Sequence, residues 1–492
     1  MLNSASRVNS SLEIPNSIRA PFILRMMERL LTVKTLSKLR SLYDKLSQRL
    51  SSADFIANFT ATINQDTRVQ LVRMEDWASE KHCPLIKVAL SYKLTGKIIV
   101  WVEYSDTLEI GYVPVSYTTE ISPDFNNFTM HFLPVSERFF FPFKKDGWVI
   151  FNIQQVGYYR VNYDDDNWRR ISNYLNSDNY MKIHVLNRAQ IIDDAFHLMI
   201  GSQLNCHIFW DLIKYLHREE DYVAWYPMFK AMEYMYGTFP WKEMVGNVTF
   251  RIKHALYKVL EKIKYEEIDD TDELRICLRQ EATRWACFLG DYVCMREAKN
   301  KLVHHLQNHT KHKLLPWWQE WTYCNGLMIT NNKTIWRLVY DIGYEKFNPK
   351  FIQYLTCPDN AYMTRDYLRF KSITERENQY VLTYSLLHII TRHAKDQNTL
   401  FFILDDLLQV KPKHVDITAA IIIIINNVYS VNRIQQISRF IQDLLKDNVY
   451  IIVDMEAKDV IKQNFNKIKS KISIRNSQIK RQRQYFDSIF YY

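Results

Sequence analysis

The character of the sequence changes within the stretch GYYRVNYDDDNW, residues 157–168. Ahead of it, short runs of β-branched and aromatic residues alternate with turn-forming residues, which is the pattern of β-strands. After it, apolar residues recur at helical spacing through to the end of the sequence. The stretch therefore predicts a junction between a β-rich region and a long helical region.

The region ahead of the junction has two parts. Residues 15–82 are predicted to be helical, because apolar side chains there recur every three or four positions. The next part is predicted to hold strands at Ile86–Leu90, Lys97–Val102, Leu108–Val115, Phe128–Leu133 and Trp148–Ile153. Short strands at near-regular spacing, separated by Gly-, Pro- and Asp-containing turns, favour a small β-sandwich.

The region after the junction is predicted to be an α-solenoid. Only 10 glycines and 13 prolines occur in 492 residues, which favours helices over turn-rich folds. No exact repeat is visible, but at about 40 residues per helix pair the length suits about eight pairs. Solenoids curve and usually bind ligands along their concave face.

The net charge of +10 comes from 64 basic and 54 acidic residues. The local concentration is Lys467, Lys469, Lys471, Arg475, Lys480, Arg481 and Arg483. Nucleic-acid binding would need a basic stripe with stacking aromatics, so a solvated helix face is preferred and no nucleic acid is expected as partner. No apolar run reaches the length of a transmembrane segment, and Met1–Arg19 has no signal-peptide pattern.

The spacing of the cysteines bears on the compartment, because pairing within local units is typical of lumenal or secreted proteins. Cys287 and Cys294 lie seven apart around a short turn, and Cys324 and Cys357 follow. The spacing alone leaves open whether these four form disulfides or are buried thiols. A further sequon begins at Asn9, and the candidate glycosylation sites are Asn58, Asn127, Asn247, Asn308 and Asn332.

No catalytic constellation is visible in the residues. The sequence has no His-Glu-x-x-His zinc motif, no Gly-rich nucleotide-binding loop and no Gly-x-Ser-x-Gly elbow. His305, His309 and His312 would share one side of a helix, where a polar face is preferred to a metal site. The adjacent acids at 193–194 and 405–406 are expected on different helix faces, which disfavours a carboxylate dyad.

Three motifs carry a resemblance to a known family: GYYRVNYD followed by NW within 157–168, LNRAQIIDDAF at 186–196, and EDYVAW at 220–225. In this order and spacing they resemble the junction between the β-sandwich and the helical C-terminal domain of the gluzincin aminopeptidases. This family includes aminopeptidase N and the endoplasmic reticulum aminopeptidases. The stretch WASEKHCPLI at 77–86 resembles the family's entry into the sandwich, so the resemblance covers nearly the whole chain.

The resemblance implies a mainly α fold with a small β-sandwich. A helical tail of a thermolysin-like catalytic domain would occupy 1–82, the sandwich 83–164, and a HEAT-like superhelical domain 165–492. Four residues of the motifs are expected to pin the sandwich to the first solenoid helices, namely Tyr159, Arg160, Asn187 and Arg188.

The resemblance also concerns the cysteines, because aminopeptidase N-like ectodomains carry two disulfides of similar spacing. It implies the pairs Cys287–Cys294 and Cys324–Cys357. The remaining cysteines are expected to be free, and they are Cys83, Cys206 and Cys277.

The family's zinc helix and exopeptidase motif would both lie upstream of residue 1. The position of the family's transition-state tyrosine corresponds to Ser17, and a serine is too short to replace a phenol that stabilises an oxyanion. The expectation is therefore that this chain has no catalytic residue, no metal ligand and no cofactor, zinc being the cofactor of the family.

Two functions follow as hypotheses. The first is a non-catalytic, truncated aminopeptidase-like protein of the secretory pathway or cell exterior, with peptides expected in the solenoid concavity. The second is a partial chain of a zinc metalloaminopeptidase that removes N-terminal residues from peptides. Ser17 favours the first, whereas disulfide-type cysteines without a signal peptide favour the second. A third and weaker reading is a remnant without a ligand, and the oligomeric state is not predicted.

Overall fold

The computed structural model describes residues 16–30, 75–78, 80, 82–91, 96–103, 108, 110–126, 128–143, 147–239, 246–265, 271–345, 350–374, 379–445 and 455–490. The chain divides into two compact units. The first comprises Met1–Ala231 with Ile489–Tyr492, and the second comprises Met232–Ser488. The strands and the first helices after the junction share the first unit, and the predicted three-domain boundaries stay a prediction.

The described part of the first unit contains three sheets. Their strands are β1 (Leu85–Ser91), β2 (Lys97–Val102), β3 (Tyr112–Val115), β4 (Tyr117–Thr119), β5 (His131–Pro134), β6 (Phe139–Pro142), β7 (Val149–Phe151) and β8 (Arg160–Tyr163). One sheet has the order β6-β2-β1-β8, with β1 antiparallel to β2 and parallel to β8. The other two are the antiparallel pairs β3-β5 and β4-β7.

The three sheets meet at a group of aromatic rings. Every second residue of β2, with the sequence KIIVWV, is buried, as expected for a half-buried strand. The ring of Phe141 in β6 lies 4.9 Å from that of Tyr117 in β4 and 5.1 Å from that of His131 in β5. Phe151 of β7 stacks on Tyr117 at 5.3 Å. The predicted β-rich region is thus confirmed, whereas its description as a sandwich stays a prediction.

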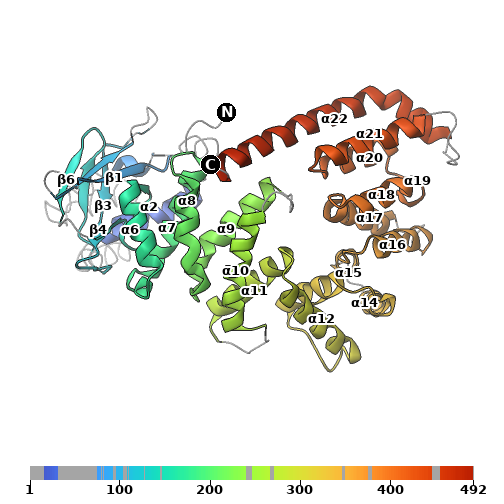
Figure 1. The fold of residues 1–492 in the computed structure, drawn as a ribbon, viewed down its shortest axis with the longest axis horizontal. Coiled ribbons are helices and arrows are strands. Elements are labelled where there is room, and N and C mark those ends of the chain that lie inside the picture. Colours follow the sequence, from blue (N-terminus) through green and yellow to red (C-terminus); the bar gives the residue numbers. More distant parts are fainter. Residues whose placement is uncertain are drawn as a thin grey trace, which may run out of the picture. The chain divides into compact units, whose positions relative to one another are not determined.

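Helices lie beside these sheets within the first unit, as Figure 1 shows for α2, α6 and α7. The helical elements are α2 (Asn16–Leu30), η1 (Glu75–Ala78), η2 (Ile153–Gln155), α6 (Asp165–Leu175), η3 (Tyr180–Lys182), α7 (Val185–Ile200), α8 (Cys206–Leu212), η4 (Ile213–His217) and α9 (Tyr222–Thr238), which belongs to the second unit from Met232 onward. The carboxylate of Asp164 caps α6 by accepting from the Asn167 amide and also accepts from the Leu90 amide of β1. One side chain of the motif stretch therefore joins a strand to the start of a helix.

The described part of the second unit is helical. Its elements are α10 (Gly246–Ile263), α11 (Glu273–Phe288), α12 (Tyr292–Gln307), η5 (Pro316–Trp318), η6 (Trp321–Asn325), α13 (Gly326–Met328), α14 (Lys333–Glu345), α15 (Lys350–Leu355), α16 (Ala361–Thr374), α17 (Gln379–His393), α18 (Gln397–Asp405), α19 (Leu407–Val410), α20 (Ile417–Asn426), α21 (Val431–Leu445) and α22 (Met455–Phe490). Helices adjacent in sequence pack together, as α10 does with α11 and α14 with α15. One apolar core extends from Leu302 in α12 to Ile479 in α22. The prediction of a mainly α fold is confirmed.

The basic stretch near the C-terminus lies in α22. Six of its seven side chains are exposed, in agreement with a solvated face. Arg475 is the exception, because it is buried, donates from Nε to the Val428 carbonyl oxygen at 3.0 Å and lies over the Tyr429 ring. Among the helices that the structure describes, none is long and apolar enough to cross a membrane.

Candidate functional site

The guanidinium of Arg160 joins β8 to α7. Its Nη1 lies 2.6 Å from Asp193 Oδ2 and 3.2 Å from Asp194 Oδ1. The two aspartates were expected on different helix faces, yet both reach this one cation, because Arg160 lies between them at the start of β8. Burial raises the pKa of Asp194 to about 7, with Arg160 opposing it. Burial also raises the pKa of Asp193, but the charge of Arg160 outweighs this effect and holds that pKa below its usual range. Asp193 is therefore the ionised partner of Arg160.

A left-handed turn next to β8 is held by Asn187 of α7. Asn152 and Gln154 have φ values of 64° and 51°, which are costly for residues other than glycine. Asn187 Oδ1 accepts from the Gln154 amide at 2.7 Å, and its Nδ2 donates to the Asn152 carbonyl oxygen at 2.9 Å. The buried ring of Tyr159 packs so close to Gly157 that a Cβ there would lie 2.0 Å from it. Asn187 thus links the strand region to α7.

Arg188 has different partners. Its Nε and Nη2 donate to the two carboxylate oxygens of Glu219, and Nη1 donates to the Ile183 carbonyl oxygen. It therefore joins α7 to the segment ahead of α9 and does not reach the strands. The interdomain role of the four motif residues stays a proposal, with Arg160 and Asn187 placed for it.

The second unit contains a cavity of about 630 Å³, within the size range of small-ligand sites. It lies among α11, the segment η5–η6–α13, and α17, and aromatic and charged side chains dominate its lining. The aromatic side chains are Tyr236, Phe288, Trp317, Trp318 and Trp321. The charged side chains are Glu281, Arg284, Glu320, Asp359, Arg392 and Lys395. Such a mixture can hold a ligand with both apolar and ionised groups.

The two arginines of the cavity differ in their partners. Arg284 of α11 is exposed and pairs with Glu281 at 2.6 Å and Glu233 at 3.1 Å. Arg392 of α17 is partly buried, and among the described residues no carboxylate lies within ion-pair distance of it. Burial lowers the pKa of its guanidinium, with the more distant Asp359 and Glu320 opposing. Arg392 is therefore a partly buried cation at the wall of a cavity, without a carboxylate partner among the described residues.

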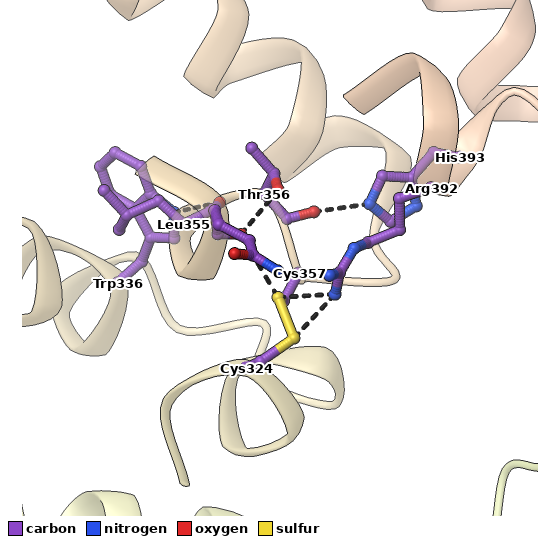
Figure 2. Close-up of a disulfide and its surroundings, with 8 residues drawn as sticks. Cys324, Trp336, Leu355, Thr356, Cys357, Arg392 and His393 are labelled. Carbon is purple, nitrogen blue, oxygen red and sulfur yellow. Dashed lines mark hydrogen bonds between the residues drawn. A yellow bond between two sulfur atoms is a disulfide. The ribbon is translucent and has the colours of Figure 1, made fainter. Parts of the chain in front are cut away.

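A disulfide supports the guanidinium of Arg392, as Figure 2 shows. Cys324 and Cys357 are bonded, and Nη1 of Arg392 lies 2.7 Å from the first sulfur and 2.6 Å from the second. The neighbouring His393 donates from Nε2 to the Thr356 carbonyl oxygen at 2.7 Å. These contacts fasten the end of α17 to the chain around Cys357.

The other disulfide, Cys287–Cys294, connects the end of α11 to the start of α12. Gly290 takes a φ of 78° in the turn between them, and Asp291 caps α12 by accepting from the Cys294 amide. Both disulfides that the resemblance implied are present in the structure. Cys83, Cys206 and Cys277 take no part in a disulfide, also as implied.

Comparison with known proteins assigns the helical region. Residues 148–392 match the family model of the ERAP1-like C-terminal domain. The chain is 25% identical over 377 residues to aminopeptidase N of Plutella xylostella, covering 73% of this chain and 39% of that protein. This chain matches the C-terminal part of an aminopeptidase N-like enzyme.

Other aminopeptidase relatives give the same placement. Membrane alanyl aminopeptidase of Heliothis virescens is 26% identical over 341 residues, covering 66% of this chain and 30% of that protein. Human thyrotropin-releasing hormone-degrading ectoenzyme is 26% identical over 278 residues, covering 52% and 25% respectively. The chain therefore spans about a quarter to two fifths of the length of these relatives. The family match includes the junction motifs and ends at Arg392 of the cavity.

Aminopeptidase N-like enzymes form a family of zinc enzymes, whereas the sequence predicts no metal ligand in this chain. Within the described ranges, no group of three or more His, Cys, Asp or Glu could hold a metal ion. The histidines do not share one helix side, because α12 ends at Gln307, ahead of His309 and His312. His305 is buried and bonds through its ring to the His312 carbonyl oxygen and the Tyr323 hydroxyl. Ser17 lies in α2, and its side chain is outside the described residues.

The structure describes some of the candidate glycosylation sites of this aminopeptidase relative. Asn308 and Asn332 are exposed, at the end of α12 and just before α14. Asn247 lies in α10, but its side chain is outside the described residues, as are the whole of Asn58 and Asn127. Glycosylation at all five stays a prediction.

Sequence reasoning did not find the cavity of this aminopeptidase relative. Its wall combines residues of α11, η6 and α17, which are separated by about a hundred positions. Arg392 stands in an ordinary helical pattern, Leu-His-Ile-Ile-Thr-Arg-His. The available signal was the helical spacing of Tyr384, His388 and Arg392, which gathers polar and aromatic groups on one side of α17.

Proposed function

We propose that the helical unit of this chain binds peptides, and that the cavity holds the peptide end that carries a free carboxylate. The observation that carries this is Arg392, a partly buried guanidinium at the cavity wall with no carboxylate partner among the described residues. A partly buried cation favours an anionic ligand, because charge-assisted hydrogen bonds are strong where little water reaches them. The relationship to aminopeptidases supports a peptide as that ligand.

The helical fold supports the same proposal. Successive helices pack on their neighbours in sequence around one continuous core, which supports an α-solenoid as the fold of this unit. We place the proposed peptide on the concave face of this solenoid. The aromatic side chains Trp317, Trp318 and Trp321 would then cover apolar residues next to the terminal carboxylate.

The proposed role of the chain is peptide recognition, not cleavage. Its 492 residues contain no His-Glu-x-x-His motif, and this pair of histidines with its glutamate is the ligand and base set of the related enzymes. Disulfides form in oxidising compartments, which supports the secretory pathway or the cell exterior as its location.

A second candidate is a zinc aminopeptidase of which this chain is one part. The observation in its favour is that the chain covers 39% or less of the relatives named above, whose names describe aminopeptidases and a hormone-degrading enzyme. Peptide binding by the helical unit would serve both candidates.

The proposal is tested by titrating the purified chain with a labelled oligopeptide that ends in a free carboxylate, and with the same peptide amidated. We expect saturable binding of the free acid that weakens with added salt, because screening acts over about 10 Å at 0.1 M salt. Amidation should weaken binding about tenfold or more, since a hydrogen bond between charged groups contributes about 1.5–3 kcal/mol.

The variant Arg392→Gln should bind both peptides equally weakly. Arg284→Gln is the matched control, because Arg284 lines the same cavity but is already paired with two glutamates. It should keep the preference for the free acid. Signal that does not saturate, or equal binding of both peptides by the unmodified chain, contradicts the proposal.

A further inference from the structure

Four cysteines form two disulfides in the second unit, and only one of these bonds contacts the cavity. Cys324 lines the cavity, and both sulfurs of Cys324–Cys357 touch Nη1 of Arg392 (Figure 2). Among the described residues, the sulfurs are the only side-chain partners of this guanidinium. The orientation of the cation is therefore set by a covalent bond that thiol reductants can break.

We propose that the Cys324–Cys357 disulfide positions Arg392 for an anionic ligand, so that reduction of this one bond weakens anion binding in the cavity. The inference rests on the proposed function, since the anion is the carboxylate of the bound peptide. Cys324 and Cys357 are positioning residues, and Arg392 is the group that contacts the ligand.

The choice of sulfur as the partner has an electrostatic consequence. A carboxylate in the same place would hold the guanidinium but also neutralise its charge, as Glu281 and Glu233 do for Arg284. A disulfide sulfur is a weak, uncharged acceptor. It orients Arg392 while leaving its charge available to a ligand.

Reduction removes the fixed geometry of this support. The disulfide holds together Cys324 in η6 and Cys357 just after α15, which are 33 positions apart. Once the bond is broken, the two sulfurs separate to at least their van der Waals distance, and one nitrogen can no longer contact both in the same way. Each thiol also becomes a donor that faces the donors of Arg392. The guanidinium then loses its preferred orientation at the cavity wall.

The reductant is a dithiol, and the exchange proceeds in two steps. One dithiol thiolate attacks the sulfur of Cys324, forming a mixed disulfide while Cys357 leaves as a thiolate. The second thiolate of the same reductant molecule then attacks the reductant sulfur that is bonded to Cys324. This closes a cyclic disulfide within the reductant and releases Cys324 as a thiolate. Two electrons pass to the protein, and each cysteine takes up a proton that the dithiol has given up. Cys324 is the sulfur to be attacked, because it lies at the cavity wall, whereas Cys357 is fully buried.

The contact with Arg392 also affects which disulfide is reduced first. A neighbouring cation stabilises a leaving thiolate, and stabilised thiolates leave faster. Cys287–Cys294 is fully buried, and Cys294 Sγ lies 3.2 Å from an uncharged group, the Thr283 carbonyl oxygen. We therefore expect Cys324–Cys357 to open before Cys287–Cys294. If opening Cys324–Cys357 weakens carboxylate binding, then a bound carboxylate must in turn make that bond harder to open, so the ligand should protect Cys324–Cys357 from reduction.

The experiment uses the full chain in three forms: the unmodified chain, the variant with Cys324→Ser and Cys357→Ser, and the control with Cys287→Ser and Cys294→Ser. Each is titrated with the free-acid peptide and the amidated peptide. We expect the first variant to bind the free acid about tenfold more weakly and the amide unchanged, because only the interaction with charge is lost. The control should retain the preference of the unmodified chain.

A second measurement leaves all four cysteines of the two disulfides in place. The unmodified chain and Arg392→Gln are treated with dithiothreitol, and free thiols are mapped over time. We expect Cys324–Cys357 to open first in the unmodified chain and more slowly in Arg392→Gln. The free-acid peptide should slow opening in the unmodified chain, whereas the amide should not.

The outcomes separate the two proposals. If the oxidised, unmodified chain shows no preference for the free acid, the proposed function fails, whatever the order of reduction. If that preference exists but persists when Cys324–Cys357 is opened or removed, the proposed function stands and the role of the disulfide is wrong. The inference is also contradicted if Cys287–Cys294 is reduced before Cys324–Cys357 in the unmodified chain. The same holds if Cys324–Cys357 opens as fast in Arg392→Gln as in the unmodified chain.

Discussion

At the scale of single residues, burial decides how much a charge pair contributes to the stability of the fold. Arg188 is 8% exposed and its partner Glu219 is 3% exposed, and two hydrogen bonds join the guanidinium to the carboxylate. A third donor of Arg188 satisfies the Ile183 carbonyl oxygen. Arg169 and Asp166 form a pair of similar length, 2.7 Å, but are 66% and 53% exposed. The first pair is part of the interior, whereas the second is screened by water.

Arg188→Ala should lower the free energy of unfolding by about 3–5 kcal/mol, because it leaves the Glu219 carboxylate buried without its partner. Chemical denaturation followed by circular dichroism measures this change. Arg169→Ala is the control and should change stability by less than about 0.5 kcal/mol. Peptide affinity per folded molecule should be the same in both variants. If Arg188→Ala is as stable as the unmodified chain but has lost peptide binding, Arg188 belongs to a ligand site.

At the scale of elements, Asp406 joins three helices of the second unit. It lies between α18 and α19, and its carboxylate accepts from Arg365 and Arg369, one turn apart on α16. The adjacent Asp405 also bonds to Arg365. The two acids were expected on different helix faces, but the break between α18 and α19 brings both to the same arginine. Burial raises the pKa of Asp406, but the hydrogen bonds from the two arginines outweigh it and leave that pKa below 3.8.

Asp406→Asn should lower the free energy of unfolding by about 2 kcal/mol at neutral pH, since an amide cannot match the charged acceptor. The folded-state pKa of Asp406 is below the unfolded value, so its stabilising contribution is present above about pH 3.9. It is lost as the pH falls through the folded-state pKa. The stability difference between variant and unmodified chain should therefore be constant from pH 7 to about 5 and shrink below about 3.9. A difference that grows in acid contradicts this account.

Elements with a local pattern were predictable from the sequence, and those fixed by distant contacts were not. Strand β2 has the predicted bounds Lys97–Val102, because its alternation is complete within six residues. Strand β8 was not predicted, since its pairing with β1 joins residues about 75 positions apart. The helix containing His305 ends earlier than its histidine spacing suggested, because Asn308 leaves the helical conformation. Local periodicity does not reveal such ends.

At the scale of the whole molecule, the same limit applies to the candidate site. The junction motifs are contiguous stretches, so their resemblance to the aminopeptidase family could be recognised and is confirmed by the family match over 148–392. The disulfides followed from that resemblance. Arg392 did not, because its contacts with Cys324 and Cys357 span 68 and 35 positions. A cavity built from distant segments becomes visible only once the helices are packed.

The composition of the whole chain leads to a prediction about metal and catalysis. Zinc in the related enzymes requires two histidines one helical turn apart, a third ligand and a glutamate base, and the sequence contains no such motif. The purified chain should therefore bind no stoichiometric zinc and should not hydrolyse aminoacyl reporter substrates. Metal analysis after dialysis and a chelator-controlled assay measure both, with full-length aminopeptidase N of Plutella xylostella treated in parallel as the positive control. Zinc held tightly in a fixed ratio to the chain, together with chelator-sensitive hydrolysis, would instead support the zinc aminopeptidase as the function.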